Sequence, residues 1–450
     1  MQKEKITICG AGLVGSLLSI YLIQRGFDVR VIEKRSNPLK SFSDKGRSIN
    51  LAISHRGIHA LANALPDLEK KVLKGLAVPM HGRQIHDMTG RLSFQPYGKS
   101  GQHINSIGRT SLNKLLIEEA IRLGVHFLFE HTCNDYNEST KKWSFQTLAG
   151  DYIYTDPGEV VIGADGAFSM IREKMHLHEK QYRLDELDYG YIELDIISEE
   201  AIGIAGREAL HIWPRERFML IALPNNDGSF TATLFLPMEG ALSFSSLDSN
   251  DQIKNFFNTY FPDTKKLLPD VPEQFLHHQV SKLFTVHADK WYNSHTLLIG
   301  DAAHALVPFY GQGMNAGFED CRILAEIIDR QEVLDWERVF KEFFHQRKKN
   351  ADAISDLALQ NFIEMRDLVA DESFLIRKKI ESYLHSVFPE TFIPQYTMVS
   401  FTDTSYSDAV DAGIFHEKIL NEIMEIAEIK NKWPDQEVQA MAKNIALKYL

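Results

Sequence analysis

The chain has 450 residues, 44% of them hydrophobic and 24% charged, so it is long enough for two or three domains with a substantial buried core. Its 61 acidic residues outnumber its 49 basic residues, and the net charge of -12 argues against nucleic-acid binding, which requires a basic surplus or stripe. The three cysteines are far apart and form no Cys-x-x-Cys pair, which favours a reducing compartment over a disulfide framework.

The first apolar segment, GLVGSLLSIYLI at residues 12–23, follows Lys3 and Lys5 as the core of a signal peptide would. It lacks a small-x-small cleavage site, however, and RGFDVRVIEK continues at once with a strand pattern of its own. No later stretch reaches the ~18 uncharged apolar residues that a membrane span needs. The sequence therefore predicts a soluble, cytoplasmic protein with no membrane anchor.

The first thirty-five residues predict a strand, a glycine turn, a helix and a second strand. The strand ITIC leads into Gly10-Ala11-Gly12-Leu13-Val14-Gly15, a helix pattern follows, and the strand DVRVIE ends at Glu33. Gly10 permits a tight turn, Gly12 lets the backbone approach a pyrophosphate, and Gly15 lets the helix pack closely on the strand. Glu33 would accept hydrogen bonds from a ribose 2′-OH, which disfavours NADP and leaves FAD or NAD open. A purely structural glycine turn is the alternative interpretation.

Two further turns follow predicted strands. Gly163-Ala164-Asp165-Gly166, the DG turn, comes after a strand at 159–162 and precedes a helix with Ser169 and Arg172. A simple helix cap at Asp165 is the alternative to a ligand contact there. Gly300-Asp301, the GD turn, comes after the strand TLLI, and GQGMN at 311–315 then opens a helix. Asp301 stands three residues before His304, so a catalytic pair or a metal site is a further interpretation of this segment.

The three turns together, in this order and at these separations, resemble the FAD-dependent aromatic hydroxylases, the single-component flavoprotein monooxygenases. The resemblance implies an α/β fold with a Rossmann-like FAD-binding domain, an inserted and mostly antiparallel β-sheet substrate domain, and a C-terminal helical region. The strands YGYIELDI, ALHIWPR, FMLIALP and SFTATLFLP, joined by MHGRQIH, would form the inserted sheet. The expected boundaries are 1–75, 105–180 and 286–330 for the FAD-binding domain, 76–104 and 181–285 for the sheet, and 331–450 for the helices.

The same resemblance implies bound FAD and a transient visit by NADPH, in keeping with the absence of a second GxGxxG. Asp301 would contact the ribityl chain, the backbone from Gly313 to Asn315 would face the flavin ring, and Arg109 would lie near the flavin phosphates. His304 would then have a structural role. The complete set of expected cofactor-binding residues is Gly10, Gly12, Leu13, Val14, Gly15, Glu33, Arg47, Arg109, Asp165, Asp301, Gly313, Met314 and Asn315.

Longer stretches, among them HIWPR, NFIEMRD and FIPQYTMVSF, resemble those family members that hydroxylate L-kynurenine, over about residues 5–403. The resemblance implies that the amino-acid end of kynurenine is held by Arg83, Tyr97, Asn361 and Tyr396. It implies an apolar wall around the aniline ring formed by Ile221, Leu223, Phe235, Phe309 and Tyr310, with Glu364 and Met365 beside it. An arginine fork backed by tyrosine hydroxyls suits a carboxylate, although Arg83 alone could be a surface ion pair and Tyr97 an ordinary turn residue.

The implied reaction converts L-kynurenine to 3-hydroxykynurenine with NADPH and O2, through a flavin C4a-hydroperoxide, in tryptophan degradation by the kynurenine pathway. No side-chain acid or base is expected, because the aniline ring is already electron-rich and the flavin carries the chemistry. The alternatives are a related hydroxylase of another aromatic acid, an FAD-dependent reductase or desaturase that does not use O2, and a flavin-binding sensor.

Three further segments carry expectations. Residues 413–450 are charged and amphipathic and predict two helices, broken at Pro434, that could contribute to a homodimer. His176 and His178 could chelate a metal from a strand, but they lack a nearby third ligand, so no metal site is expected. The run FHQRKKNADAISD is expected to be a solvated helix face.

Overall fold

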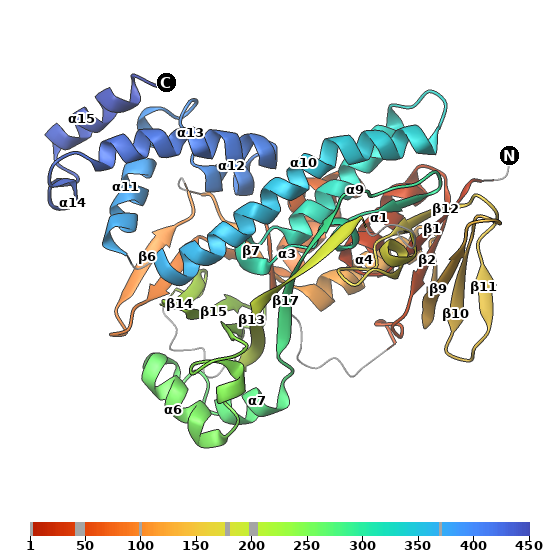
Figure 1. Ribbon diagram of the computed structural model, residues 1–450, viewed down its shortest axis with the longest axis horizontal. Coiled ribbons are helices and arrows are strands. Elements are labelled where there is room, and N and C mark those ends of the chain that lie inside the picture. The colour runs from red at the N-terminus through yellow and green to blue at the C-terminus, as the bar shows by residue number, and fades with distance from the viewer. Residues whose placement is uncertain (1–2, 41–49, 99–100, 176–180, 198–205, 369–370) are drawn as a thin grey trace. The chain divides into compact units, whose positions relative to one another are not determined.

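The structure, a computed structural model, describes residues 3–40, 50–98, 101–175, 181–197, 206–368 and 371–450 (Figure 1). The chain divides into two compact units. Unit 1 comprises Met1–Val78, Asn105–Leu187 and Lys282–Ala358, and unit 2 comprises Pro79–Ile104, Asp188–Ser281 and Leu359–Leu450. The three-part domain division expected from the sequence stays a prediction.

A five-stranded parallel sheet lies at the centre of unit 1, in the order β18-β12-β1-β2-β8. Its strands are β1 Lys5–Cys9, β2 Asp28–Glu33, β8 His126–Phe129, β12 Val160–Gly163 and β18 Thr296–Leu298. Val160, Val161 and Ile162 are consecutive residues of β12 whose side chains point to alternate faces, and all three are buried, as expected for a strand covered on both faces. The predicted Rossmann-like sheet, with the helix α1 Leu13–Gln24 between β1 and β2, is therefore confirmed.

Helices and two small sheets surround this centre. α1 packs against α4 Arg109–Arg122 and α9 Gly313–Asp329, and α9 packs against α2 His55–Ala64. The other helices of unit 1 are α3 Leu68–Gly75, α5 Met170–Met175, α8 Asp301–His304 and η4 Pro308–Tyr310. The long α10 Trp336–Ile363 begins in unit 1 and ends in unit 2. The small sheets are β3 Asn50–Ile53, β7 Ile104–Gly108 and β4 Ala77–Met80, and β11 Tyr152–Tyr154, β10 Lys142–Thr147 and β9 His131–Asn137.

Most of a seven-stranded sheet, in the order β17-β13-β16-β15-β14-β5-β6, forms the centre of unit 2. Its strands are β5 Gly82–His86, β6 Leu92–Pro96, β13 Tyr182–Ile196, β14 Leu210–Arg215, β15 Phe218–Pro224, β16 Phe230–Pro237 and β17 Ser281–Ala288. β17 and the start of β13 belong to unit 1. β13 and β16, β16 and β15, β15 and β14, and β5 and β6 pair antiparallel, whereas β14 and β5 pair in parallel. All four predicted strands, and the strand MHGRQIH that was expected to join them, are confirmed.

One face of this sheet is covered by helices that the sequence pattern did not predict. Leu220, Leu234 and Trp213 on that face are fully buried in a core that also contains Phe256, Phe257 and Phe275. These phenylalanines come from α6 Asn250–Tyr260 and α7 Val271–His277, which flank η3 Pro262–Thr264 and follow η2 Phe244–Ser246. Ser249 caps α6 by accepting a hydrogen bond from the N–H of Gln252, which is the local start signal that was available in the sequence.

The C-terminal part of unit 2 is helical. It contains η5 Glu364–Leu368, a single π-helical turn, then α11 Glu372–Val387, α12 Gln395–Phe401, α13 Tyr406–Met424, α14 Ile429–Lys432 and α15 Gln436–Ala446. Two helices interrupted at Pro434 were predicted after residue 413, and α13 and α15 match them, with the short α14 between. Ile380, Ile419 and Val438 lie in one buried cluster that joins α11, α13 and α15. In the part of the chain that the structure describes, no helix combines the length and the apolar character of a membrane crossing.

The charge run on α10 differs from the sequence-based expectation. Arg347 within it is only 1% exposed, and its guanidinium binds Glu319 and Asp320 of α9. The prediction of a solvated helix face is therefore wrong at Arg347. The partners of this arginine lie on another helix, so the sequence pattern of α10 alone did not reveal them.

Candidate cofactor and substrate sites

The first glycine turn, residues 10–15, contains glycines with different structural needs. Gly10 has φ of +105°, and a Cβ atom there would collide with the backbone of Ala164. A Cβ atom on Gly15 would collide with the carbonyl oxygen of Gly10. Gly12, by contrast, has no described heavy atom within 4 Å of its Cβ position. α1 begins here without a side-chain cap, so open space adjoins amides that suit a phosphate.

Glu33 lies at the end of β2 and is 5% exposed. Its carboxylate accepts hydrogen bonds from the N–H of Ala11 at 2.8 Å and from the N–H and Nε of Arg35 at 2.9 and 2.8 Å. Burial alone would raise the pKa of Glu33, but the bonds from Arg35 and Ala11 lower it below its ordinary value. Ribose hydroxyls would compete with the guanidinium of Arg35 for the carboxylate oxygens of Glu33. The side chain of Arg35 is 60% exposed, so it can turn away from Glu33.

The structure brings the three sequence turns together within unit 1. The N–H of Ala164 in the DG turn donates to the carbonyl of Cys9 at 2.8 Å. Nη1 of Arg172, after the DG turn, donates to the carbonyl of Ala302 at 2.8 Å, and this bond joins the DG turn to the helix of the GD turn. The predicted cofactor residues on these turns therefore surround the carboxyl ends of β1, β12 and β18, where ligands bind in open α/β sheets.

The aspartates of the second and third turns differ in their contacts. Asp165 accepts hydrogen bonds from Ser169 Oγ at 2.5 Å and from the N–H of Ile171 at 3.2 Å, so it holds the start of α5. Burial raises the pKa of Asp165. Asp301 is the exposed first residue of α8. His304 is buried, and its Nε2 lies 2.6 Å from Oδ2 of Asp320 rather than pairing with Asp301, which fits the structural role expected for His304.

The turn that opens α9 has an open position followed by a fixed one. A Cβ atom on Gly313 would meet no described atom within 4 Å. The side chain of Asn315 accepts from the N–H of Ser54 at 2.9 Å and donates to the carbonyls of Ala52 and Gly311, both at 2.8 Å. The side chain of Asn315 is thus occupied in anchoring β3, so only the backbone of Asn315 is left for the expected contact with the cofactor. Met314, between them, is buried.

The first turns of α4 carry two polar residues, Arg109 and Asn113. Arg109 is exposed at the first position of α4, after the uncapped N-cap Gly108. Asn113 was not predicted as a site residue, yet its Nδ2 donates to the carbonyl of Ala11 at 3.1 Å. Its Oδ1 is buried and has no hydrogen-bond partner among the described residues, so it is an acceptor that a bound ligand can satisfy. Arg47, also expected here, lies outside the described residues.

In unit 2, Arg83 on β5 lies among the residues expected to hold an amino acid. Its Nη1 is 3.2 Å from Oε1 of Glu364 on η5, and its guanidinium carbon lies 5.1 Å from the ring centroid of Tyr396 and 5.8 Å from that of Tyr97. The two tyrosine rings stack with centroids 5.5 Å apart. Asn361 is buried one turn before Met365 and donates to its sulfur at 3.3 Å. Arg83, Tyr97, Tyr396 and Glu364, predicted from distant parts of the sequence, thus form one cluster.

Two buried polar atoms of this cluster have no hydrogen-bond partner among the described residues: Nε of Arg83 and the hydroxyl of Tyr97. Burial raises the pKa of Tyr97 well above its usual range, so the hydroxyl keeps its proton as a donor. Burial alone would lower the pKa of Arg83, but Tyr396 and Glu364 raise it. Two unpaired buried donors in one cluster cost stability unless an acceptor binds them, and a carboxylate is a suitable acceptor.

The strand register places the expected apolar residues on the same face of the sheet as Arg83. Arg83 on β5 pairs with Leu210 on β14. Two residues further along β14, Ile212 pairs with Ile221 on β15. Side chains of paired residues share a face and alternate along each strand, so Ile221, Leu223 and Phe235 follow on that face. η5, which carries Glu364 and Met365, packs against β14 and β15. The opposite face bears the helix-covered core.

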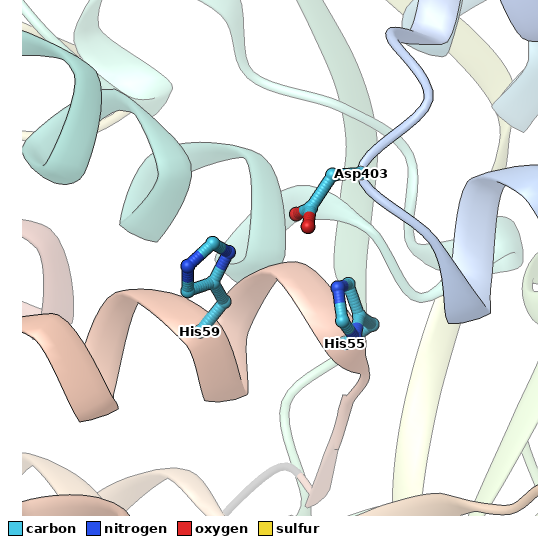
Figure 2. Close-up of side chains that lie close together, drawn as sticks. All are labelled: His55, His59 and Asp403. Atoms are coloured by element: carbon cyan, nitrogen blue, oxygen red, sulfur yellow. The ribbon is translucent and has the colours of Figure 1, made fainter.

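Phe309 and Tyr310 are buried in η4, which belongs to unit 1. Their assignment to the apolar wall of the substrate site stays a prediction. His55 and His59 lie one turn apart on α2, with ring centroids 5.9 Å apart (Figure 2). Two histidines are fewer ligands than a zinc site needs, and Asp403 in the same view belongs to unit 2. His176 and His178 lie outside the described residues.

Comparison with known proteins decides among the flavin-dependent families. A family model described as an FAD binding domain matches residues 3–335. Kynurenine 3-monooxygenase from Cytophaga hutchinsonii is 62% identical over 450 residues, which cover 100% of both chains. The chain belongs to the kynurenine 3-monooxygenase family.

Other kynurenine 3-monooxygenases are similar over nearly the same length. That of Myxococcus xanthus is 44% identical over 94% of this chain and 91% of its own, and that of Dictyostelium discoideum is 41% identical over 94% of both. A solved structure of 2-methyl-3-hydroxypyridine-5-carboxylic acid oxygenase superposes with a TM-score of 0.67 at 19% identity, over 83% of this chain and 96% of that one. A tetracycline destructase superposes with a TM-score of 0.60 at 16% identity, over 80% and 89%. At this identity the two structures indicate the fold alone.

Proposed function

We propose that the chain is an FAD-dependent monooxygenase that converts L-kynurenine to 3-hydroxykynurenine with NADPH and O2. Its membership of the kynurenine 3-monooxygenase family supports this reaction. The structural observation that carries the substrate assignment is the pair of unpartnered buried donors, Arg83 Nε and the Tyr97 hydroxyl, beside Glu364. A zwitterionic amino acid offers a carboxylate to the first two and an ammonium group to the third.

The FAD residues proposed for unit 1 are those of the three turns. The amides at the start of α1 and the open Gly12 suit the pyrophosphate, and Glu33 suits a ribose. Asp301 is exposed where a ribityl chain would be contacted, and the amides from Gly313 to Asn315 are proposed for the flavin ring. FAD, when bound and reduced by NADPH, supplies the activation of O2.

The side chains bind and orient the substrate. Arg83 and Tyr97 would hold the α-carboxylate, with Tyr396 stacked behind Tyr97 and Asn361 beside Met365. The apolar side chains on the face of Arg83 would exclude water from the aniline ring; they are Ile221, Leu223 and Phe235, with Phe309 and Tyr310 proposed from unit 1. No side-chain acid or base is assigned, because the amino group already activates the ring carbon next to it.

We also propose a cytoplasmic location and a homodimer. The described cysteines are free, and Cys9 and Cys321 are buried, which suits a reducing compartment. The exposed apolar side chains Ile414 on α13 and Met441 on α15 make the C-terminal helices the proposed contact surface. Sedimentation of the wild type beside Ile414→Glu tests the dimer.

The decisive experiment mixes the purified, FAD-loaded protein with NADPH and L-kynurenine in air. We expect kynurenine to accelerate NADPH oxidation and to yield a product with one added oxygen on the ring carbon beside the amino group. If kynurenine yields only hydrogen peroxide, or if benzoate or anthranilate is hydroxylated instead, the substrate assignment is wrong. If the reduced flavin does not react with O2, the alternative of a reductase or a sensor holds.

A further inference from the structure

Asp320, seven residues after the start of α9, is fully buried and uses both of its carboxylate oxygens within unit 1. Oδ1 accepts a hydrogen bond from Nε of Arg347 at 2.6 Å. Oδ2 accepts from the backbone N–H of Gly300 at 3.1 Å and from Nε2 of His304 at 2.6 Å. Gly300 and His304 stand on either side of Asp301, so one carboxylate holds both ends of the turn that carries Asp301.

The carboxylate of Asp320 is held as an anion by a buried ionic network. Arg347 also donates to Oε2 of Glu319 at 2.6 Å, and Arg56 donates to Oε1 of Glu319 at 2.6 Å. Two guanidinium groups thus face two carboxylates, which balances the buried charge. Burial alone would raise the pKa of Asp320, but His304 and Arg347 hold it below its ordinary value. Asp320 therefore stays an acceptor for three donors.

We infer that Asp320 is a positioning residue for FAD, acting through Gly300 and His304 to present Asp301 to the cofactor. Asp320 is 0% exposed and every oxygen is engaged, so it has no surface with which to touch a ligand itself. Gly300 has φ of +58°, a left-handed conformation that its N–H bond to Asp320 helps to maintain. The inference rests on the FAD site of the proposed function and adds a residue that contacts neither FAD nor substrate.

An asparagine at position 320 cannot replace the carboxylate, although it has nearly the same shape. If its oxygen faces Gly300, its NH2 group faces Nε–H of Arg347, and two donors oppose each other. If the amide is flipped, its NH2 group faces the N–H of Gly300 instead. In either orientation at least one buried donor loses its acceptor.

The test is FAD binding by the apoprotein, followed by flavin fluorescence, for the wild type and Asp320→Asn. We expect the dissociation constant of FAD to rise by roughly ten- to one-hundred-fold. His304→Gln, which keeps a donor for Asp320, should bind FAD nearly as the wild type does, whereas His304→Leu should bind it more weakly. Asp329→Asn on the same helix is the matched control, because Asp329 is half-exposed and pairs with Arg25 far from the turn.

The outcomes separate the inference from the site on which it rests. Folding of each apoprotein is checked by circular dichroism and thermal unfolding. Unchanged FAD affinity in a folded Asp320→Asn protein, or equal losses for His304→Gln and His304→Leu, would overturn the positioning role. Should Asp320→Asn fail to fold, the two His304 variants decide the question. A wild-type apoprotein that does not bind FAD would instead refute the proposed cofactor site.

Discussion

The Cγ2 atom of Val14 lies 2.6 Å from the position that a Cβ atom would take on Gly317. The same atom lies 3.0 Å from the Cβ position of Gly300. Val14 belongs to the first glycine turn, Gly300 to the GD turn and Gly317 to α9. The first glycine turn therefore meets two segments from a distant part of the sequence at one valine side chain, because neither of those segments has a side chain at the point of contact.

Gly317→Ala should destabilise unit 1 by about 1–3 kcal/mol, because the added methyl group overpacks a buried contact with a stiff β-branched side chain. Urea unfolding of the apoprotein measures the change. Gly313→Ala on the same helix is the control, since nothing described lies within 4 Å of its Cβ position. Equal stability of Gly317→Ala and the wild type would show that Val14 can move aside freely.

Gly12→Ala and Gly10→Ala should fail in different ways. Gly12 has φ of -70° and open space around its Cβ position, so the alanine variant should fold normally but bind FAD at least about tenfold more weakly, because the methyl group occupies the approach of the pyrophosphate. Gly10→Ala should lower the unfolding free energy itself, because φ is +105° and Ala164 blocks the methyl group. Paired FAD titration and urea unfolding distinguish them; normal FAD affinity in Gly12→Ala would contradict the pyrophosphate assignment.

Tyr97→Phe should weaken L-kynurenine binding without destabilising the ligand-free protein. The hydroxyl is buried and unpartnered among the described residues, so its removal should leave the free energy of unfolding equal or raise it by about 1 kcal/mol. Kynurenine affinity, measured by flavin absorbance changes, should fall about tenfold if the hydroxyl donates to the carboxylate. A variant that loses stability but keeps its affinity would show that Tyr97 is structural.

Arg83→Met should weaken L-kynurenine binding by about a hundredfold or more, because the substrate carboxylate loses its cationic partner and Glu364 loses its neighbour. Reduction of the flavin by NADPH without kynurenine should remain as in the wild type. Arg91→Met, at an exposed arginine between β5 and β6, is the matched control. Unaltered kynurenine affinity in Arg83→Met would remove the anchor from the proposed site.

Acidification should destabilise unit 2 through His211. Nε2 of His211 lies 3.0 Å from the carbonyl of Gly206, and its Nδ1 lies 2.9 Å from Nε2 of His86, which is 2.8 Å from Asp263 through its other nitrogen. Burial and the neighbouring His86 lower the pKa of His211 to about 4. Between pH ~6.5 and 4 the unfolded chain binds a proton at this position that the folded chain rejects, so stability falls by about 3 kcal/mol as the pH drops through that window.

Urea unfolding between pH 7 and 4 tests this dependence. His211→Gln should flatten the loss over the window, while His126→Gln, at an exposed histidine, should keep the slope of the wild type. A wild-type slope in His211→Gln would assign the pH dependence to other groups.

The sequence by itself determined the local elements and the cofactor class. β1, α1 and β2 follow from apolar runs broken at Gly10–Gly15, and the strands of unit 2 follow from alternating patterns, because these signals are local and repeat with the period of the element. The family resemblance added Arg83, Tyr97 and Tyr396. Between 244 and 277 α6 and α7 were not predicted, although Ser249 and the helical spacing of Ile253, Phe256 and Phe257 are local signals for α6.

Only the tertiary structure decided which partner each polar side chain has. His304 stands three residues from Asp301 in the sequence, yet it binds Asp320, and Arg347 in a charged run is buried against the same carboxylate. Val14 meets two glycines that lie about three hundred residues further along the chain. Such contacts depend on how helices pack over the sheet, and burial then selects among the many charge pairs that the sequence would allow, because an unpaired charge cannot remain inside.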